Sequence, residues 1–368
     1  MNIIFDNKAY YIQKFGGVSV VFNELQKRAL MDSDAQCKFI EYGNDGNLYQ
    51  KSLNIPEELI IQRSPLFFGL KRLFPVSVKM DKPFVFQSTY FSFCSNPNAI
   101  NINTVHDFIE VKVGNDKKGS KLRSFYQGYI IGKSDVIVCI SENTKRDLFN
   151  LYPHVKKDNV HVIYNSASDI YHIKKSVEKE LPFPKGTYLI YVGARAQRKN
   201  YHLLRDVIGQ TNYNLVIVGS KFSEEEKQEI EKHIPASRYV DLGFTEDERL
   251  NELYNNAAAL VYPSSYEGFG IPVLEAQQAG CPVIALNSSS IPEVISSNPE
   301  NCPLLMQKDT KEELLSKIRL LSNKDLMAQV SFDGLENAKR FSWDKTYEEY
   351  RKLYESLINN KNRNIDII

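Results

Sequence analysis

The chain has 368 residues, more than one ordinary hydrophobic core organises, and this length suits two domains of roughly 150 to 200 residues each. The charges nearly balance, because 46 Lys and Arg stand against 45 Asp and Glu, and the formal net charge of +1 argues against a general nucleic-acid binder. The five cysteines are scattered without CxxC spacing, so neither a disulfide framework nor a zinc site is indicated. This cysteine usage fits a reducing cytoplasm, and no apolar run approaches the ~20 residues that cross a bilayer.

The first 170 residues alternate strand-like and helix-like patterns. Apolar, strand-like runs cover residues 3–5, 84–88, 135–141 and 160–165, and an amphipathic segment covers about 18–30. This alternation is typical of a parallel sheet covered by helices. We therefore expect a first α/β domain over residues 1–170.

A polar, proline-containing stretch follows Asn165 and is interpreted as an interdomain connection. The alternation then restarts, with strand-like runs at 188–193, 215–219, 257–263 and 281–286. We expect a second, similar α/β domain over residues 171–345 and a final helical segment with a polar tail over 346–368. Aromatic residues spaced by three and four in that final region predict one buried helix face; they are Trp343, Tyr347, Tyr350 and Tyr354.

Two carboxylates bracket a glycine-rich turn between the strand-like runs 257–263 and 281–286. Glu267 stands before the sequence GFG, and Glu275 stands eight positions later on a helix that is expected from about Pro272 to Gly280. The loop leaves the carboxyl end of a strand, and open α/β sheets bind their ligands at that edge. Acidic residues are also common near helix starts, but two of them around GFG favour a binding site.

The residues of this turn suit a nucleotide. Gly268 and Gly270, on either side of Phe269, let the backbone approach a ligand closely, and the free amides of the helix start attract anions. Glu275 is placed on the first helical turn, where its carboxylate can accept hydrogen bonds from the paired hydroxyls of a ribose. Glu267 is expected to face a different part of the ligand.

Other candidate residues lie at the expected carboxyl ends of further strands. Arg195 and Lys199 follow the strand-like run 188–193 and are expected to meet a diphosphate, on which negative charge grows as its bond to a sugar breaks. Arg198, between them, is interpreted as a solvated surface residue. His106 ends another strand, where both a packed structural role and a substrate contact stay open.

Two further short motifs are less informative alone. Gly16 and Gly17 precede the first amphipathic segment and offer a second turn that suits anions. The sequence Asp-Ser-Asp at 32–34 looks like a metal-binding DxD but lies in a short polar turn, so we interpret it as a turn. No other acidic or His cluster has metal-ligand spacing, and we expect no metal or other cofactor.

Together these motifs resemble glycosyltransferase family 4, the retaining enzymes of GT-B fold. The resemblance covers most of the chain and rests above all on PSSYEGFGIPVLEAQQAGCPVIA (263–285) followed by SIPEV, where the E-x7-E arrangement is specific. Weaker matches support it: the GG turn, the HD pair at 106–107, ISENTKRDL, VIYN, VGARAQRKN and LGFTEDERLNELYNNA. The implied fold is GT-B, with two Rossmann-like parallel-sheet domains facing a cleft and a C-terminal helix crossing back to the first domain.

The resemblance also implies a role for each matched residue. Glu275 would hold the donor's ribose, Glu267 would contact the transferred sugar, and Lys199 with Arg195 would neutralise the diphosphate. Gly17, beside Gly16, would border the phosphates, and His106 would approach the donor sugar. Many members have Arg directly after the Gly of this loop, where this chain has Ala194, so Arg195 is expected to substitute for it.

The implied activity is retaining, metal-independent hexose transfer from a nucleotide-diphosphate sugar. The hexose would be mannose, glucose, galactose or N-acetylhexosamine, and the acceptor a glycan or polyprenyl-diphosphate-linked oligosaccharide in O-antigen, capsule or exopolysaccharide synthesis. The donor domain would be the second one, and the acceptor would bind the first. A sugar-nucleotide epimerase of the same fold and a non-catalytic sugar-nucleotide binder stay open as alternatives.

Residues 59–82 combine aromatic and basic side chains, including Phe67, Phe68, Lys71 and Arg72. Such a segment can rest on an anionic bilayer beside a lipid-linked acceptor, which would make the protein peripheral to the inner face of the plasma membrane. A packed loop whose Lys stems cover apolar surface is the alternative. We favour the membrane contact.

Overall fold

The computed structural model of the chain describes residues 1–12, 16–43, 47–64, 74–112, 117–175 and 180–365. It divides into two compact units. Unit 1 comprises residues 1–165 and 343–368, and unit 2 comprises residues 166–342. The chain therefore enters unit 2 at Ser166, and not after residue 170 as the sequence predicts. The final segment of unit 1 begins at Trp343, and not at the predicted residue 346.

The described residues of unit 1 form one parallel seven-stranded sheet in the order β3-β2-β1-β4-β5-β6-β7. The strands are β1 (Asn2–Asp6), β2 (Gln36–Glu41), β3 (Ile60–Gln62), β4 (Phe84–Ser88), β5 (Ala99–Val105), β6 (Val136–Cys139) and β7 (Val160–Val162). Every residue of β4, β5 and β6 is buried, because helices cover both faces of a parallel sheet.

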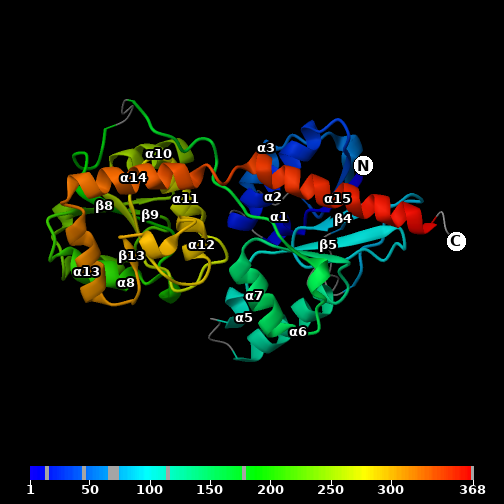
Figure 1. Cartoon of the computed structure of the whole chain (residues 1–368), viewed down its shortest axis with the longest axis horizontal. Helices are drawn as coiled ribbons and strands as arrows, with labels where there is room; N and C mark the ends of the chain where they lie inside the picture. The colour runs from blue at the N-terminus through cyan, green and yellow to red at the C-terminus, as the bar shows by residue number, and fades with distance from the viewer. Residues whose placement is uncertain (13–15, 44–46, 65–73, 113–116, 176–179, 366–368) are drawn as a thin grey trace. The chain divides into compact units, whose positions relative to one another are not determined.

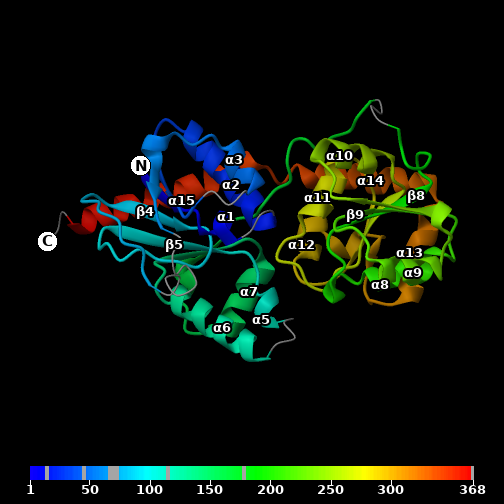
Figure 2. The same ribbon diagram turned by 180° about the vertical axis from the view of Figure 1, so that it is seen from behind.

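Helices flank this sheet in two groups, which Figure 1 and the reverse view in Figure 2 both separate. One group includes α2 (Gly17–Met31), α3 (Leu48–Ser52) and α15 (Trp343–Ile365), and the other includes α5 (Ile109–Lys112), α6 (Lys117–Ile131) and α7 (Glu142–Leu151). The short α1 (Lys8–Ile12) follows β1 directly. The expected alternation of strands and helices in the first domain is confirmed.

The last helix, α15, packs on unit 1 through the aromatic face that the sequence predicts. Trp343, Tyr347, Tyr350 and Tyr354 are all buried. Three tyrosine hydroxyls also find polar partners: Tyr347 donates to Asp32 Oδ2 (2.7 Å), Tyr354 to Gln87 Oε1 (2.8 Å), and Tyr350 lies 2.9 Å from Thr104 Oγ1. Because Asp32 ends α2 and accepts this bond, its DSD sequence is a structural turn, as expected.

Unit 2 repeats the architecture with a parallel sheet whose described strands run β10-β9-β8-β11-β12-β13. They are β8 (Tyr188–Val192), β9 (Asn214–Val218), β10 (Tyr239–Gly243), β11 (Ala259–Tyr262), β12 (Val283–Leu286) and β13 (Leu305–Met306). The helices are α8 (Tyr201–Ile208), α9 (Glu224–Glu231), α10 (Asp247–Asn256), α11 (Ile271–Gln278), α12 (Ile291–Ile295), α13 (Lys311–Leu320) and α14 (Lys324–Ala338). Figure 2 shows α10, α11 and α14 on one face of this sheet and α8, α9 and α13 on the other.

The strand order determines where a ligand can bind in each unit. In unit 2 the chain runs outward from β8 through β9 to β10 and then returns to the other side of β8 as β11. The loops after β8 and β11 therefore diverge at a topological switch point, where open α/β sheets bind ligands. Unit 1 has the equivalent point between β1 and β4.

Much of the predicted membrane-contact segment, residues 65–73, lies outside the described residues, including Phe67, Phe68, Lys71 and Arg72. The part that follows packs on unit 1: Val76, Val78 and Met80 contact the buried cluster that contains Phe84 and Phe86. In the part of the chain that the structure describes, no helix combines the length and apolarity that a membrane span requires.

Candidate functional site

Two loops of unit 2 meet at the switch point between β8 and β11. The loop after β8 ends in a short 3-10 turn, Gln197–Lys199, and turns into α8 through Asn200 in a left-handed conformation. Arg198 and Asn200 hold the loop that follows β11, because the backbone oxygen of Arg198 accepts from the Ser265 amide (2.8 Å) and Asn200 Nδ2 donates to the Pro263 oxygen (3.0 Å). These bonds fix the loop after β8 (residues 193–200), which we call the basic loop, against the loop after β11 (residues 263–270), which we call the EGFG loop.

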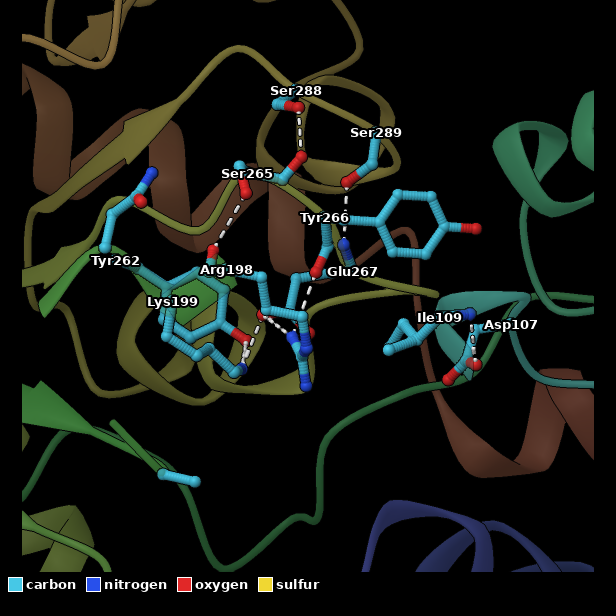
Figure 3. Close-up of polar contacts among 12 residues, drawn as sticks. Asp107, Ile109, Arg198, Lys199, Tyr262, Ser265, Tyr266, Glu267, Ser288 and Ser289 are labelled. Atoms are coloured by element: carbon cyan, nitrogen blue, oxygen red, sulfur yellow. Dashed lines mark hydrogen bonds and ion pairs between the residues drawn. The ribbon is translucent and has the colours of Figure 1, made fainter. Parts of the chain in front are cut away.

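A nearly buried ion-pair cluster joins these loops (Figure 3). Lys199 Nζ lies 2.5 Å from Glu267 Oε1, and Arg198 Nη1 lies 3.2 Å from the same oxygen. Lys199 also donates to the Tyr262 hydroxyl (2.9 Å), and Arg198 donates to the Tyr266 carbonyl (3.0 Å). We call Lys199, Arg198 and Glu267 the cation cluster, since it gathers two positive charges around one carboxylate.

Burial and charge act in opposite directions on this cluster. Burial would raise the pKa of the Glu267 carboxyl, but Lys199 and Arg198 outweigh it and hold that pKa below its ordinary value. Burial lowers the pKa of the Lys199 ammonium, and Glu267 offsets part of that shift. The Glu267 carboxylate is therefore ionised at neutral pH. The cluster carries an excess positive charge at the rim, which suits an anion.

A third loop supports the EGFG backbone from β12. Ser289 Oγ accepts from the Glu267 amide (2.8 Å), and Ser290 Oγ donates to the carbonyls of Glu267 (3.1 Å) and Phe269 (2.9 Å). Ser288 donates to the Ser265 oxygen (2.5 Å). These serines are not among the predicted site residues, although their position directly after the strand-like run 281–286 is a usable signal.

The glycines of the motif serve the turn into α11, the helix that contains Glu275. Gly270 has a left-handed φ of 103°, and a Cβ there would lie 2.7 Å from Ile291 Cδ1. Gly268 lies in the same loop. Phe269 is 3% exposed and packs edge-on against Phe341 with ring centroids 5.8 Å apart, so its side chain belongs to the core of unit 2 and only its backbone can face a ligand.

Glu275 lies on the second turn of α11 rather than the first, because the helix begins at Ile271. Tyr254 donates to Glu275 Oε2 (3.1 Å), and Tyr171 donates to the nearby Asp247 (2.9 Å). Burial, with a contribution from the Asp247 charge, raises the pKa of Glu275 to about 8. At neutral pH this carboxyl is therefore largely protonated, and its carbonyl oxygen can still accept a hydrogen bond from a hydroxyl group.

The structure places the two arginines of the basic loop differently from the prediction, which put Arg195 beside Lys199 and Arg198 in solvent. Arg195 forms a bidentate pair with Glu226 (2.7 and 2.8 Å), lies over the Phe222 ring, and donates to the Ser220 carbonyl (2.6 Å). The structure therefore does not bring Arg195 to Lys199 and Glu267. Arg198 occupies that position, with a side chain only 20% exposed, so our interpretation of Arg198 as a solvated surface residue is wrong.

The remaining predicted site residues belong to unit 1 and lie near one another there. Gly16 caps α2 and Gly17 begins it, and Val18 lines the same pocket as His106. The His106 ring packs edge-on against Phe22, and burial lowers the pKa of this imidazole to about 4. His106 is therefore neutral at neutral pH, which suits hydrogen bonding to hydroxyls rather than to phosphates.

Among the described residues, no three His, Cys, Asp or Glu side chains gather at metal-binding distances. The expectation of a metal-independent reaction stays a prediction.

Residues 172–341, nearly all of unit 2, match the family model described as glycosyl transferases group 1. Curated relatives extend the similarity into unit 1. The chain is 29% identical over 260 residues to an uncharacterized glycosyltransferase of Methanocaldococcus jannaschii, covering 70% of this chain and 68% of that protein. It is 31% identical over 180 residues to O-antigen chain mannosyltransferase B of Escherichia coli, covering 46% of each chain. It is 30% identical over 215 residues to the O-antigen chain mannosyltransferase RfbU of Salmonella typhimurium, covering 54% of this chain and 57% of that one.

Solved structures show the same fold over the whole length. The chain superposes on Anabaena HepE in complex with UDP and glucose with a TM-score of 0.70 at 14% identity, covering 97% and 100% of the two chains. A sucrose-phosphate synthase from Thermosynechococcus elongatus gives a TM-score of 0.73 at 17% identity, covering 98% and 100%.

Residues 172–341 thus match the glycosyl transferases group 1 model, and the chain has the GT-B fold, with two parallel-sheet domains. Both the predicted fold and the predicted resemblance to surface-polysaccharide glycosyltransferases are confirmed. The chain spans between 46% and 68% of the length of the three curated relatives described above. Assignment to family 4 stays a prediction.

Replacing Gly270 by Ala should destabilise unit 2 by about 2–3 kcal/mol, because the new Cβ must both accept a positive φ and displace the buried Ile291 side chain. Gly186→Ala is the matched control, since Gly186 has a φ of +74° with no atom within 4 Å of the added Cβ, and it should cost about 1 kcal/mol. Urea unfolding measures both losses. Equal losses would show that the contact with Ile291 contributes nothing.

Lys199→Met should lower the free energy of unfolding by about 3 kcal/mol, since it leaves the Glu267 carboxylate buried with only Arg198 as a partner. In Lys227→Met, the lost ion pair with Glu224 is exposed, and the unfolding free energy should stay nearly unchanged. Chemical denaturation of both variants at pH 7 checks the contrast. A Lys199 variant as stable as the control would refute a structural role for the cation cluster.

Glu275→Gln should make stability less sensitive to pH. Between the ordinary carboxyl pKa of 4.5 and about 8, the unfolded chain has lost the Glu275 proton while the folded chain keeps it. The folded state then binds more protons, so the stability of the unsubstituted protein falls as pH rises through this range. Unfolding free energies measured from pH 5 to 8 should fall less steeply for Glu275→Gln. Parallel curves would mean that Glu275 titrates alike in both states.

Proposed function

We propose that the chain transfers a hexose from a nucleotide-diphosphate sugar to a glycan or lipid-linked acceptor in the synthesis of a bacterial surface polysaccharide. The observation that carries this proposal is the cation cluster at the switch point of a domain that matches the glycosyl transferases group 1 model. Transfer with retention of configuration, without a metal ion, is part of the proposal.

Each group of the site has a place along the donor. The ribose hydroxyls donate to Glu275, and the diphosphate lies against the start of α11, where the backbone amides and the turn at Gly270 face an anion. Lys199 and Arg198 provide the positive charge beside it. Glu267, which holds both cations, is left to accept hydrogen bonds from the sugar.

The reaction breaks the bond between the anomeric carbon and the diphosphate oxygen. The acceptor hydroxyl oxygen attacks the same face of that carbon, and its proton passes to the departing phosphate oxygen, so the anomeric configuration is retained. Charge that develops on the diphosphate is stabilised by Lys199 and Arg198, which are already held in place before the donor binds.

The named relatives favour mannose as the transferred hexose, because two of them are O-antigen chain mannosyltransferases. The structural neighbour from Anabaena is in complex with UDP and glucose, which supports a nucleoside-diphosphate donor. Glucose, galactose and N-acetylhexosamine donors therefore belong in the same screen, with both UDP- and GDP-linked forms.

We place the acceptor in unit 1 and the protein in the cytoplasm, in peripheral contact with the inner face of the plasma membrane. The basic and aromatic composition of residues 59–82 supports this placement, since it suits an anionic bilayer beside a lipid-linked acceptor. The alternatives of an epimerase and a non-catalytic binder gain no support from the relatives, which are named as transferases.

A thermal-shift screen of UDP- and GDP-sugars tests the donor site, because a ligand that binds only the folded state raises its stability. One nucleotide sugar should raise the melting temperature, and Glu275→Ala should abolish that shift. With this donor, Arg198→Met should lower the transfer rate by about 100-fold, and Arg195→Met by less than about 10-fold.

Two outcomes of this experiment would contradict the proposal. If Glu275→Ala leaves both donor binding and transfer intact, the donor site is wrongly placed. If Arg195→Met proves more damaging than Arg198→Met while both variants remain folded, the arrangement of cations around Lys199 is wrongly assigned.

A further inference from the structure

A small pocket of about 180 Å³ lies in unit 1 beyond the carboxyl ends of β4 and β5. We call it the Gln127 pocket, after the residue that α6 contributes to it. Residues from five parts of unit 1 line it: Val18, Thr89, Tyr90, Phe91, Thr104, His106, Asp107, Ile109, Glu110 and Gln127. Its position beside the β1–β4 switch point is where an open α/β sheet binds a ligand.

Two polar atoms in this pocket lack a hydrogen-bond partner among the described residues. Gln127 is 7% exposed, yet its Oε1 is buried without a donor, and the buried His106 Nε2 is also unpaired. A buried polar atom without a partner loses its hydrogen bonds to water without compensation, so such an atom points to a site that a ligand or water completes. Both atoms belong to groups that line the same cavity.

Other polar side chains that line the pocket, those of Thr89, Thr104 and Asp107, have hydrogen-bond partners. Gln127 Oε1 and His106 Nε2 therefore differ from the polar groups around them. Thr89 donates to the Asp6 carbonyl (2.6 Å), and Thr104 lies between Gln87 and Tyr350. Asp107 accepts from the Ile109 amide (3.0 Å), as Figure 3 shows. Two larger cavities, of about 470 Å³ in unit 2 and 340 Å³ beside Glu41, have no unpaired polar atom among their described lining residues.

The chemistry of the pocket suits hydroxyl groups. Gln127 Oε1 can only accept a hydrogen bond, and burial keeps the His106 imidazole neutral, with a pKa of about 4. Neither group favours a phosphate. Phe91 and Tyr90 add aromatic surface, and the volume is below the ~300 Å³ typical of sites for larger organic ligands. A single sugar ring combines hydroxyl donors with apolar C–H surface in a volume of this order.

We propose that the Gln127 pocket binds one monosaccharide ring and that Gln127 selects it by accepting a hydrogen bond from a ring hydroxyl. The inference rests on the proposed sugar transfer and extends it, because it assigns a specificity-determining residue in unit 1. The ring belongs either to the donor sugar or to the terminal sugar of the acceptor, and the two sources give different kinetic results.

Gln127→Leu tests the assignment, with Gln127→Glu as the variant that restores an acceptor oxygen and Phe125→Leu as a control on an exposed residue of the same helix. Gln127→Leu should raise one KM by at least 10-fold, and Gln127→Glu should recover part of that loss. A rise in the donor KM assigns the donor sugar, and a rise in the acceptor KM assigns the acceptor sugar. Phe125→Leu should change neither KM.

Deoxy analogues separate recognition from folding. With the unsubstituted protein, replacing one ring hydroxyl by hydrogen should weaken the substrate about 10-fold, and the Gln127→Leu variant should not distinguish that analogue from its parent. If folded Gln127→Leu keeps both KM values and still discriminates against every deoxy analogue, the inference is overturned.

Direct binding keeps this test independent of the proposed function. Methyl α-mannopyranoside and methyl α-glucopyranoside, titrated in the millimolar range with detection by saturation-transfer NMR, should bind the unsubstituted protein and not Gln127→Leu. That result supports the pocket even if no nucleotide sugar is turned over. Equal signals from the two proteins, or none from either, would overturn it, whereas loss of donor binding in Glu275→Ala reports only on unit 2.

Discussion

The site of unit 2 depends on one buried interaction, the ion pairing of Lys199 and Arg198 with a single oxygen of Glu267. Without Glu267, the neighbouring positive charges of Lys199 and Arg198 would repel each other. Without these cations, removing the Glu267 carboxylate from water would cost free energy, so the cations and the carboxylate stabilise one another. The shared pairing holds the loop after β8 against the loop after β11. It also leaves a net positive charge where the helix amides of α11 already favour an anion.

The topology explains why these loops meet at all. Lys199 and Glu267 are far apart in sequence, but their strands are neighbours because the chain reverses direction across the sheet between β10 and β11. The serines after β12 then hold the backbone of the EGFG loop from the next strand along. Three successive strand ends thus build a rigid surface, and a preorganised surface can stabilise developing charge without rearranging.

The sequence predicted the fold and the centre of the site because both depend on local patterns. Buried parallel strands appear as apolar runs, and the EGFG turn with its flanking carboxylates is contiguous. The prediction that Arg195 accompanies Lys199 was wrong. The choice between Arg195 and Arg198 depends on the geometry of the turn after β8, which directs Arg195 toward Glu226. Gln127 was missed for a similar reason: an isolated Gln within a helical pattern gives no signal until α6 is placed beside β5.

The two units differ in how much of the chain each requires. Unit 2 is one continuous segment, residues 166–342, whereas unit 1 needs α15, which follows unit 2 in the sequence. The tyrosines of α15 contribute to the core of unit 1, so that core is incomplete until α15 has been synthesised. Domains generally fold as units. Unit 2, although second in sequence, can therefore complete its fold on the ribosome before unit 1, because the core of unit 1 requires a helix that is synthesised after unit 2.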